Sequence, residues 1–140
     1  MRKIEEIIIH CTATPEGRDV TVEELRRWHK ARGFADIGYH YVIARDGEVM
    51  AGRSEETTGA HCSGRNAHSI GVCYVGGSDK SGKPKDTRTE AQKASMAELV
   101  RQLCARYALD IQKDVHGHRE YAAKACPSFD VRAWAREIRQ

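Results

Sequence analysis

Short apolar runs alternate with amphipathic segments along the chain. Residues 6–10 include three consecutive isoleucines and precede a small polar stretch that ends at Pro15, a pattern typical of a buried strand. Residues 38–44 and 69–75 are also rich in β-branched and aromatic side chains, which favour strands. We therefore predict strands at these three positions.

The dipeptide Asp46-Gly47 lies between the second of these runs and residues 48–51. It favours the tight turn of a β-hairpin, because its residues tolerate the positive φ angles that such turns need. The sequence thus predicts a hairpin here. We also expect a polar loop over residues 76–86 and a short extended segment over 114–116.

Three segments carry the signals of helices. Thr21 and Glu24 form a capping box, and the helix that follows should place Leu25 and Trp28 on one face and end at Gly33. A second helix should begin after Thr89, with Gln92 three residues later, and a third after Asp130. The predicted inward residues of these two helices are Met96, Leu99, Val100, Leu103, Tyr107, Val131 and Trp134.

These strands and helices are interleaved along 140 residues, the usual length of one domain. We predict a single domain over residues 1–140. The interleaving favours the α/β class, with a central mixed β-sheet flanked by helices.

Composition excludes several classes of protein. Hydrophobic residues make up 40% and charged residues 31%, as in soluble globular chains. The net charge is only +3, from 23 basic and 20 acidic residues that are interspersed, so we expect no nucleic-acid partner. No apolar run approaches the roughly 18 residues of a membrane span, and acids near the N-terminus argue against a signal peptide. We expect synthesis in the cytoplasm, no membrane partner, a monomer, and five reduced cysteines.

Metal-binding side chains are concentrated in three places. They are His10 at the end of the isoleucine-rich strand, the run from His116 to Glu120, and the run from Lys124 to Pro127. A catalytic zinc takes three protein ligands and keeps one position open. His10, one of the two histidines around Gly117, and Cys126 would form such a set. Each residue alone is equally compatible with a structural role.

Several motifs resemble the zinc-dependent N-acetylmuramoyl-L-alanine amidases, the family of small phage lysozymes of the amidase type and of peptidoglycan recognition proteins. The motifs follow the family order, span residues 4–138 and match the phage lysozyme type best. They are Ile7-Ile8-Ile9-His10-Cys11-Thr12-Ala13-Thr14, Trp28-His29-Lys30, Gly38-Tyr39-His40-Tyr41, Arg45-Asp46-Gly47, His61, Ser69-Ile70-Gly71-Val72, Gly117-His118-Arg119-Glu120 and Lys124-Ala125-Cys126-Pro127-Ser128-Phe129-Asp130.

The resemblance implies one Zn²⁺ per chain, bound by His10, His118 and Cys126. In the family the second ligand lies eight residues before the cysteine, which selects His118 rather than His116. His116 is left with a supporting or structural role. Glu120 is the nearest carboxylate in sequence that could act as a general base, although no motif places it there.

The resemblance also implies that Tyr39 and Lys124 are catalytic and that His61 and Asn66 contact substrate. Hydrolysis of an amide needs an activated water and stabilisation of an oxyanion, for which zinc and a nearby ammonium are suited. Tyr39 can hydrogen-bond to the reacting groups and assist proton transfer. Cys11, the next residue on the strand after His10, should point to the opposite side of the sheet.

The expected function is therefore zinc-dependent hydrolysis of the bond between N-acetylmuramic acid and L-alanine in peptidoglycan, by a phage or prophage endolysin that reaches the wall after release. A bacterial recycling enzyme or exported effector is an alternative setting. A peptidoglycan-binding module without activity is the alternative function, and the presence of Cys126 argues against it. A purely structural zinc would need a fourth protein ligand, which no motif supplies.

Overall fold

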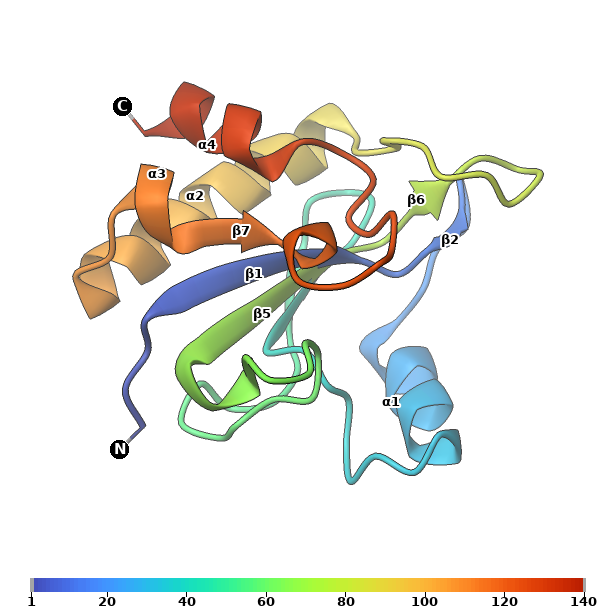
Figure 1. The fold of residues 1–140 in the computed structure, drawn as a ribbon. Helices are drawn as coiled ribbons and strands as arrows, with labels where there is room; N and C mark the ends of the chain where they lie inside the picture. The colour runs from blue at the N-terminus through green and yellow to red at the C-terminus, as the bar shows by residue number, and fades with distance from the viewer. Residues whose placement is uncertain (1, 140) are drawn as a thin grey trace.

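A computed structural model describes residues 2–139 and contains a five-stranded mixed sheet (Figure 1). The strand order is β4-β3-β5-β1-β7. Strand β1 is parallel to both of its neighbours, β5 and β7, whereas β4 pairs with β3 in an antiparallel hairpin. The strands are β1 (Glu6–Cys11), β3 (Tyr41–Ile43), β4 (Val49–Ala51), β5 (Ser69–Tyr74) and β7 (Val115–Gly117).

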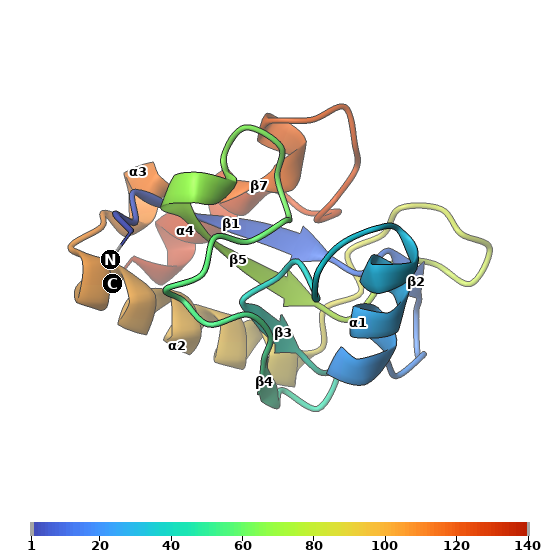
Figure 2. The same cartoon turned by 90° about the horizontal axis from the view of Figure 1, so that it is seen from below.

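Helices cover both faces of this sheet (Figures 1 and 2). Helices α2 (Glu90–Tyr107) and α4 (Val131–Ile138) pack on one face, with the short α3 (Ile111–Asp114) beside them, and α1 (Val22–Ala31) packs on the other. The predicted α/β class with a central mixed sheet flanked by helices is confirmed. A second, two-stranded sheet joins β2 (Thr14–Pro15) to β6 (Gly77–Ser78), and 3-10 turns cover η1 (Asn66–His68) and η2 (His118–Glu120).

The predicted helix starts are confirmed by their hydrogen bonds. Thr21 and Thr89 each accept from the backbone N–H three residues later, and Glu24 and Gln92 complete the capping boxes. Asp130 caps α4 through the backbone N–H of its third residue. Each cap satisfies an N–H that the helix itself leaves without a partner.

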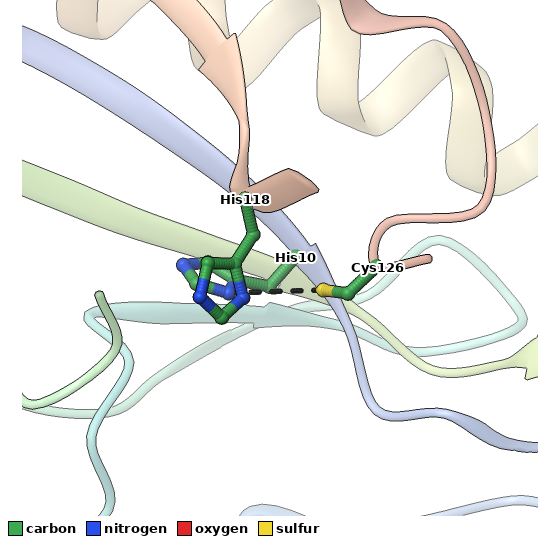
Figure 3. Close-up of side chains that lie close together, drawn as sticks. All are labelled: His10, His118 and Cys126. Atoms are coloured by element: carbon green, nitrogen blue, oxygen red, sulfur yellow. Dashed lines mark hydrogen bonds between the residues drawn. The ribbon is translucent and has the colours of Figure 1, made fainter. Parts of the chain in front are cut away.

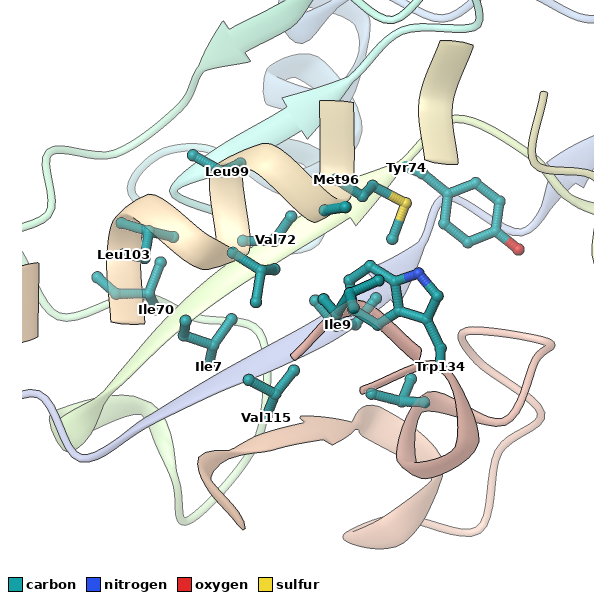
Figure 4. Packing of buried hydrophobic residues seen from close by; sticks show 14 of the residues in the cluster. Ile7, Ile9, Ile70, Val72, Tyr74, Met96, Leu99, Leu103, Val115 and Trp134 are labelled. Atoms are coloured by element: carbon teal, nitrogen blue, oxygen red, sulfur yellow. The ribbon is translucent and has the colours of Figure 1, made fainter. Parts of the chain in front are cut away.

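The main core lies between the sheet and the α2–α4 layer (Figure 4). Alternate residues of β1 and β5 enter it, because successive side chains of a strand point to opposite faces. The predicted stripe on α2 is confirmed, with Leu103 fully buried and Tyr107 partly buried against the cluster. Trp134 of α4 is also buried there, so its predicted inward position is correct.

Some local predictions were incomplete. The strand expected over residues 38–44 is regular only from Tyr41 to Ile43, because the backbone of Gly38 and Tyr39 pairs with Ala60 and Arg53 in loops. The polar loop over 76–86 contains β6, and the four-residue α3 was not predicted. Within residues 2–139 no helix has the length and apolarity to cross a membrane.

Candidate active site

Two strand ends and one loop bring the predicted metal ligands together. His10 is the fifth residue of β1, and β7, which pairs with β1, ends one residue before His118. The chain then makes the η2 turn and returns to place Cys126 beside β1 (Figure 3). The parallel pairing of β1 and β7 therefore places residues more than 100 positions apart at one edge of the sheet.

The donor atoms of His10, His118 and Cys126 all lie within 4.8 Å of one another. His10 Nδ1 is 3.9 Å from Cys126 Sγ, and the two imidazole rings are 4.5 Å apart between centroids. Nitrogen and sulfur ligands of a tetrahedral zinc are separated by about 3.6 Å, given ordinary zinc–ligand bond lengths. The set therefore fits a zinc ion after small side-chain adjustments, and it leaves the fourth position to a non-protein ligand.

The environment keeps both histidines neutral, as metal binding requires. Burial lowers the pKa of His10 well below its ordinary value, and the neighbouring His61, His118 and Lys124 add to this effect. The pKa of His118 is lowered in the same direction, first by burial and then by Lys124.

Cys126 needs a positive partner to ionise. The adjacent Cys11 thiol and burial raise the pKa of Cys126, while the Cys11 backbone N–H donates to its sulfur at 3.2 Å and favours the thiolate. A divalent cation beside the sulfur would supply the missing positive charge. Cys11 packs in the α2–α4 core as predicted, but it also lines the groove beside Cys126, so its predicted separation from the ligands is only partial.

Backbone contacts fix the loop that carries the last two ligands. The N–H of Arg119 donates to the carbonyl oxygen of Cys126 at 2.8 Å. A Cβ atom at Gly117 would lie 3.1 Å from Pro127 and 3.0 Å from Val131, so glycine permits this close approach. The two ligand segments are thus joined to each other before any metal binds.

A groove of about 590 Å³ opens over these residues, in the range of small-molecule sites. Its lining includes the three ligands together with Tyr39, Arg32 and Phe34, and Lys124. Among the described residues that line it there is no aspartate or glutamate. With Arg32 and Lys124 as its charged side chains, the groove is suited to a substrate that carries carboxylates.

Tyr39 and Lys124 both line the groove, as the family motif predicted. The half-buried Tyr39 ring lies 5.2 Å from that of His10 between centroids. Burial, assisted by nearby thiols, raises the pKa of Tyr39 well above its ordinary value, so its hydroxyl keeps its proton. Lys124 is exposed, which leaves its ammonium free to meet a bound anion. Their catalytic roles remain predictions.

His61 and Asn66 also line the groove, but both ring nitrogens of His61 and the amide oxygen of Asn66 already have partners. His61 Nδ1 lies 2.8 Å from His10 Nε2, and its Nε2 lies 3.2 Å from Ser69 Oγ. Asn66 Oδ1 accepts from the backbone N–H groups of His61 and Cys62, both at 2.9 Å. The predicted substrate contacts stay predictions, and Asn66 has a clear role in shaping the loop.

His116 and Glu120 lie outside the groove lining and bind each other. His116 Nδ1 is 2.9 Å from Glu120 Oε1, and the other carboxylate oxygen accepts from the Gly117 N–H at 2.6 Å. This pair braces the start of η2. Glu120 is not among the residues that line the groove, so its role as a general base gains no support from the structure.

Sequence reasoning missed a polar network behind the groove. Glu6, buried on β1, forms an ion pair with Arg65 at 2.8 Å and accepts from the Tyr121 hydroxyl at 2.7 Å. The Arg65 guanidinium also stacks on the Tyr121 ring at 4.2 Å. The sequence did contain a signal for this network, because an acid at a buried strand position such as Glu6 requires a compensating partner. The network joins the loops that carry Arg65 and Tyr121 to β1.

Comparisons with known proteins agree with this geometry. The family model described as N-acetylmuramoyl-L-alanine amidase matches residues 1–129. Endolysins of Enterobacteria phage T3 and Escherichia phage T7 are each 46% identical over 130 residues, covering 93% of this chain and 84% of theirs. The solved structure of the N-acetylmuramoyl-L-alanine amidase LysC from Clostridium intestinale URNW superposes with a TM-score of 0.84 at 27% identity, covering 98% of this chain and 86% of that one.

Proposed function

The chain belongs to the N-acetylmuramoyl-L-alanine amidase family, and from this premise we propose that it is a zinc-dependent amidase acting as a phage or prophage endolysin. It cleaves the amide bond between N-acetylmuramic acid and L-alanine in peptidoglycan. One observation carries the zinc dependence. Two neutral histidines and a cysteine converge within 4.8 Å beside a groove that lacks acidic side chains.

His10, His118 and Cys126 would hold the metal. A bound zinc supplies Lewis acidity for an amide carbonyl and makes water a competent nucleophile at neutral pH. We also propose that the enzyme is a monomer with a single domain over residues 1–140. It reaches the cell wall after release from the cell in which it is made.

The remaining groove residues act on the substrate. The Lys124 ammonium stabilises the negative charge that develops on the carbonyl oxygen during attack. The Tyr39 hydroxyl, which keeps its proton, donates a hydrogen bond to the reacting oxygen and orients it. Arg32, which stacks on Phe34 at 5.1 Å, provides a second cation for a carboxylate of the stem peptide.

Digestion of purified sacculi tests this function. We expect soluble peptides with a new N-terminal alanine and glycan strands that keep intact N-acetylmuramic acid, as identified by mass spectrometry. A strong chelator should abolish release, and added zinc should restore it. Cleavage between sugars, or binding to sacculi without release, would contradict the proposal, and the latter result would favour a recognition module.

A further inference from the structure

The ring of His61 contacts the ring nitrogen of His10 that does not face Cys126. His10 Nδ1 lies 3.9 Å from the sulfur, whereas His10 Nε2 lies 2.8 Å from His61 Nδ1. The two rings are nearly perpendicular, at 89°, with 4.9 Å between centroids. Behind His61, Ser69 Oγ lies 3.2 Å from Nε2 and completes a buried row of three side chains.

Two glycines hold the His61 ring in place. A Cβ atom at Gly71 would lie 2.6 Å from the ring, and one at Gly59 would lie 2.7 Å from it. The backbone N–H of His61 is fixed by Asn66 Oδ1 at 2.9 Å. The orientation of the ring is therefore set by the scaffold, which is how a supporting residue of a metal site is usually built.

The arrangement of protons in this row decides whether His10 can bind a metal. A neutral imidazole has one N–H donor and one acceptor nitrogen. If His61 donated from Nδ1 to His10 Nε2, the proton of His10 would sit on Nδ1 and face the sulfur. If His61 accepts at Nδ1 instead, His10 carries its proton on Nε2 and its Nδ1 lone pair faces Cys126 and His118.

We propose that His61 is a positioning residue that accepts the Nε2–H of His10 and so makes Nδ1 the metal-binding atom, with Ser69 as the acceptor for the Nε2–H of His61. The proposal rests on the zinc site of the proposed function. Such partners orient a ligating histidine and select its tautomer. Because both ring nitrogens of His61 have partners within the protein, this role needs no contact with substrate.

The parent protein itself provides the first test. Nitrogen-15 NMR spectra of the histidine side chains distinguish protonated, free and metal-bound nitrogens in the zinc-loaded protein. We expect His10 to be bound through Nδ1 and protonated at Nε2, and His61 to be protonated at Nε2. Zinc bound through Nε2 of His10 would overturn this inference alone, whereas failure to bind zinc would contradict the proposed function as well.

Zinc affinity provides the second test, measured by competition with a chromophoric chelator. His61→Phe keeps an aromatic ring but has no acceptor, and we expect its zinc dissociation constant to rise about 10–100-fold. His61→Asn keeps an oxygen close to the position of Nδ1 and should recover most of this loss. His68→Asn, at an exposed histidine of the same segment, is the matched control and should bind like the parent.

Parental zinc affinity in His61→Phe would overturn the inference. A raised KM with unchanged zinc affinity would do the same and would favour a direct contact with substrate. If His61→Phe does not fold, His61→Asn and the NMR spectra of the parent protein decide the matter.

Discussion

The two faces of the central sheet are made by alternate residues of the same strands but are stabilised in different ways. Towards α2 and α4, β1 presents Ile7 and Ile9, which are fully buried in a continuous apolar cluster. On the other face it presents the fully buried Ile8 between two buried polar residues, Glu6 and His10. Each of the two polar residues has a partner distant in sequence, Arg65 for Glu6 and His61 for His10.

We therefore expect the apolar face of the sheet to determine stability and the polar face to determine the chemistry of the site. Apolar burial is not directional, and many side chains contribute to it. Polar partners act in pairs, with defined atoms and distances. A change on the α2–α4 face should therefore lower stability and leave the site intact, whereas a change in the groove should alter chemistry with little effect on folding. The following substitutions test this separation, from the largest expected effect to the smallest.

Cys126→Ser should have the largest effect. It replaces a thiolate with a neutral hydroxyl that zinc binds weakly, and loss of the metal removes several kcal/mol of transition-state stabilisation, or roughly a thousandfold in rate. Zinc content and peptide release from sacculi measure the effect, and binding to sacculi should persist. Release at the parental rate would show that Cys126 is not a ligand.

Lys124→Ala should retain zinc but reduce kcat by about 10²–10³, the usual effect of losing one oxyanion stabiliser. Lys113→Ala, at a lysine that does not line the groove, is the control and should remain active. An unchanged kcat in Lys124→Ala would assign the charge stabilisation to another group.

Leu103→Ala should instead destabilise the apolar core between the sheet and α2. The side chain is fully buried, and its removal should lower the free energy of unfolding by about 3 kcal/mol, as measured by urea denaturation. Activity per folded molecule and zinc content should not change. Gln102→Ala, at an exposed neighbour on α2, should have little effect on stability. Loss of zinc by folded Leu103→Ala would show that the two faces are coupled.

Acid should lower stability through His40, a fully buried histidine that does not line the groove. Burial lowers the pKa of His40 from 6.5 to about 4, so the unfolded chain binds a proton in this window and the folded protein does not. Stability therefore falls as the pH decreases from 6.5 towards 4, by about 2 kcal/mol at pH 5 for this one group. Urea denaturation of metal-free protein measures the slope. Equal stability at pH 7 and pH 5 would refute the prediction.

Arg32→Gln should have the smallest effect. We expect KM to rise roughly threefold to tenfold with kcat unchanged, because an exposed cation in the groove contributes modestly to binding. With substrates whose stem-peptide carboxylates are amidated, the variant and the parent should have the same KM. Arg27→Gln, outside the groove on α1, is the matched control.

The apolar face was largely predictable from the sequence. Ile7 and Ile9 of β1, the stripe on α2 and the caps at Thr89 and Asp130 are each set by residues close together in sequence. Periodicity and capping report such local preferences directly. The two-residue β6 and the four-residue α3 were missed because segments this short have no period to detect.

The groove face was predictable only in part. The spacing of a family motif selected His118 over His116, and the structure brings His118 to His10 and Cys126. The row from Ser69 through His61 to His10, and the network around Glu6, join residues 8 to 115 positions apart. Such contacts depend on strand order and register, which no local pattern specifies.

Titration of chelator-treated protein with zinc tests the central claim most directly. Peptide release from sacculi is followed while zinc is added in known steps to a known amount of chain. We expect negligible release without metal, a linear rise as zinc is added, and a plateau at one zinc per chain, with no recovery in Cys126→Ser. Full activity of the metal-free protein, or recovery of Cys126→Ser to the parental level, would contradict this claim.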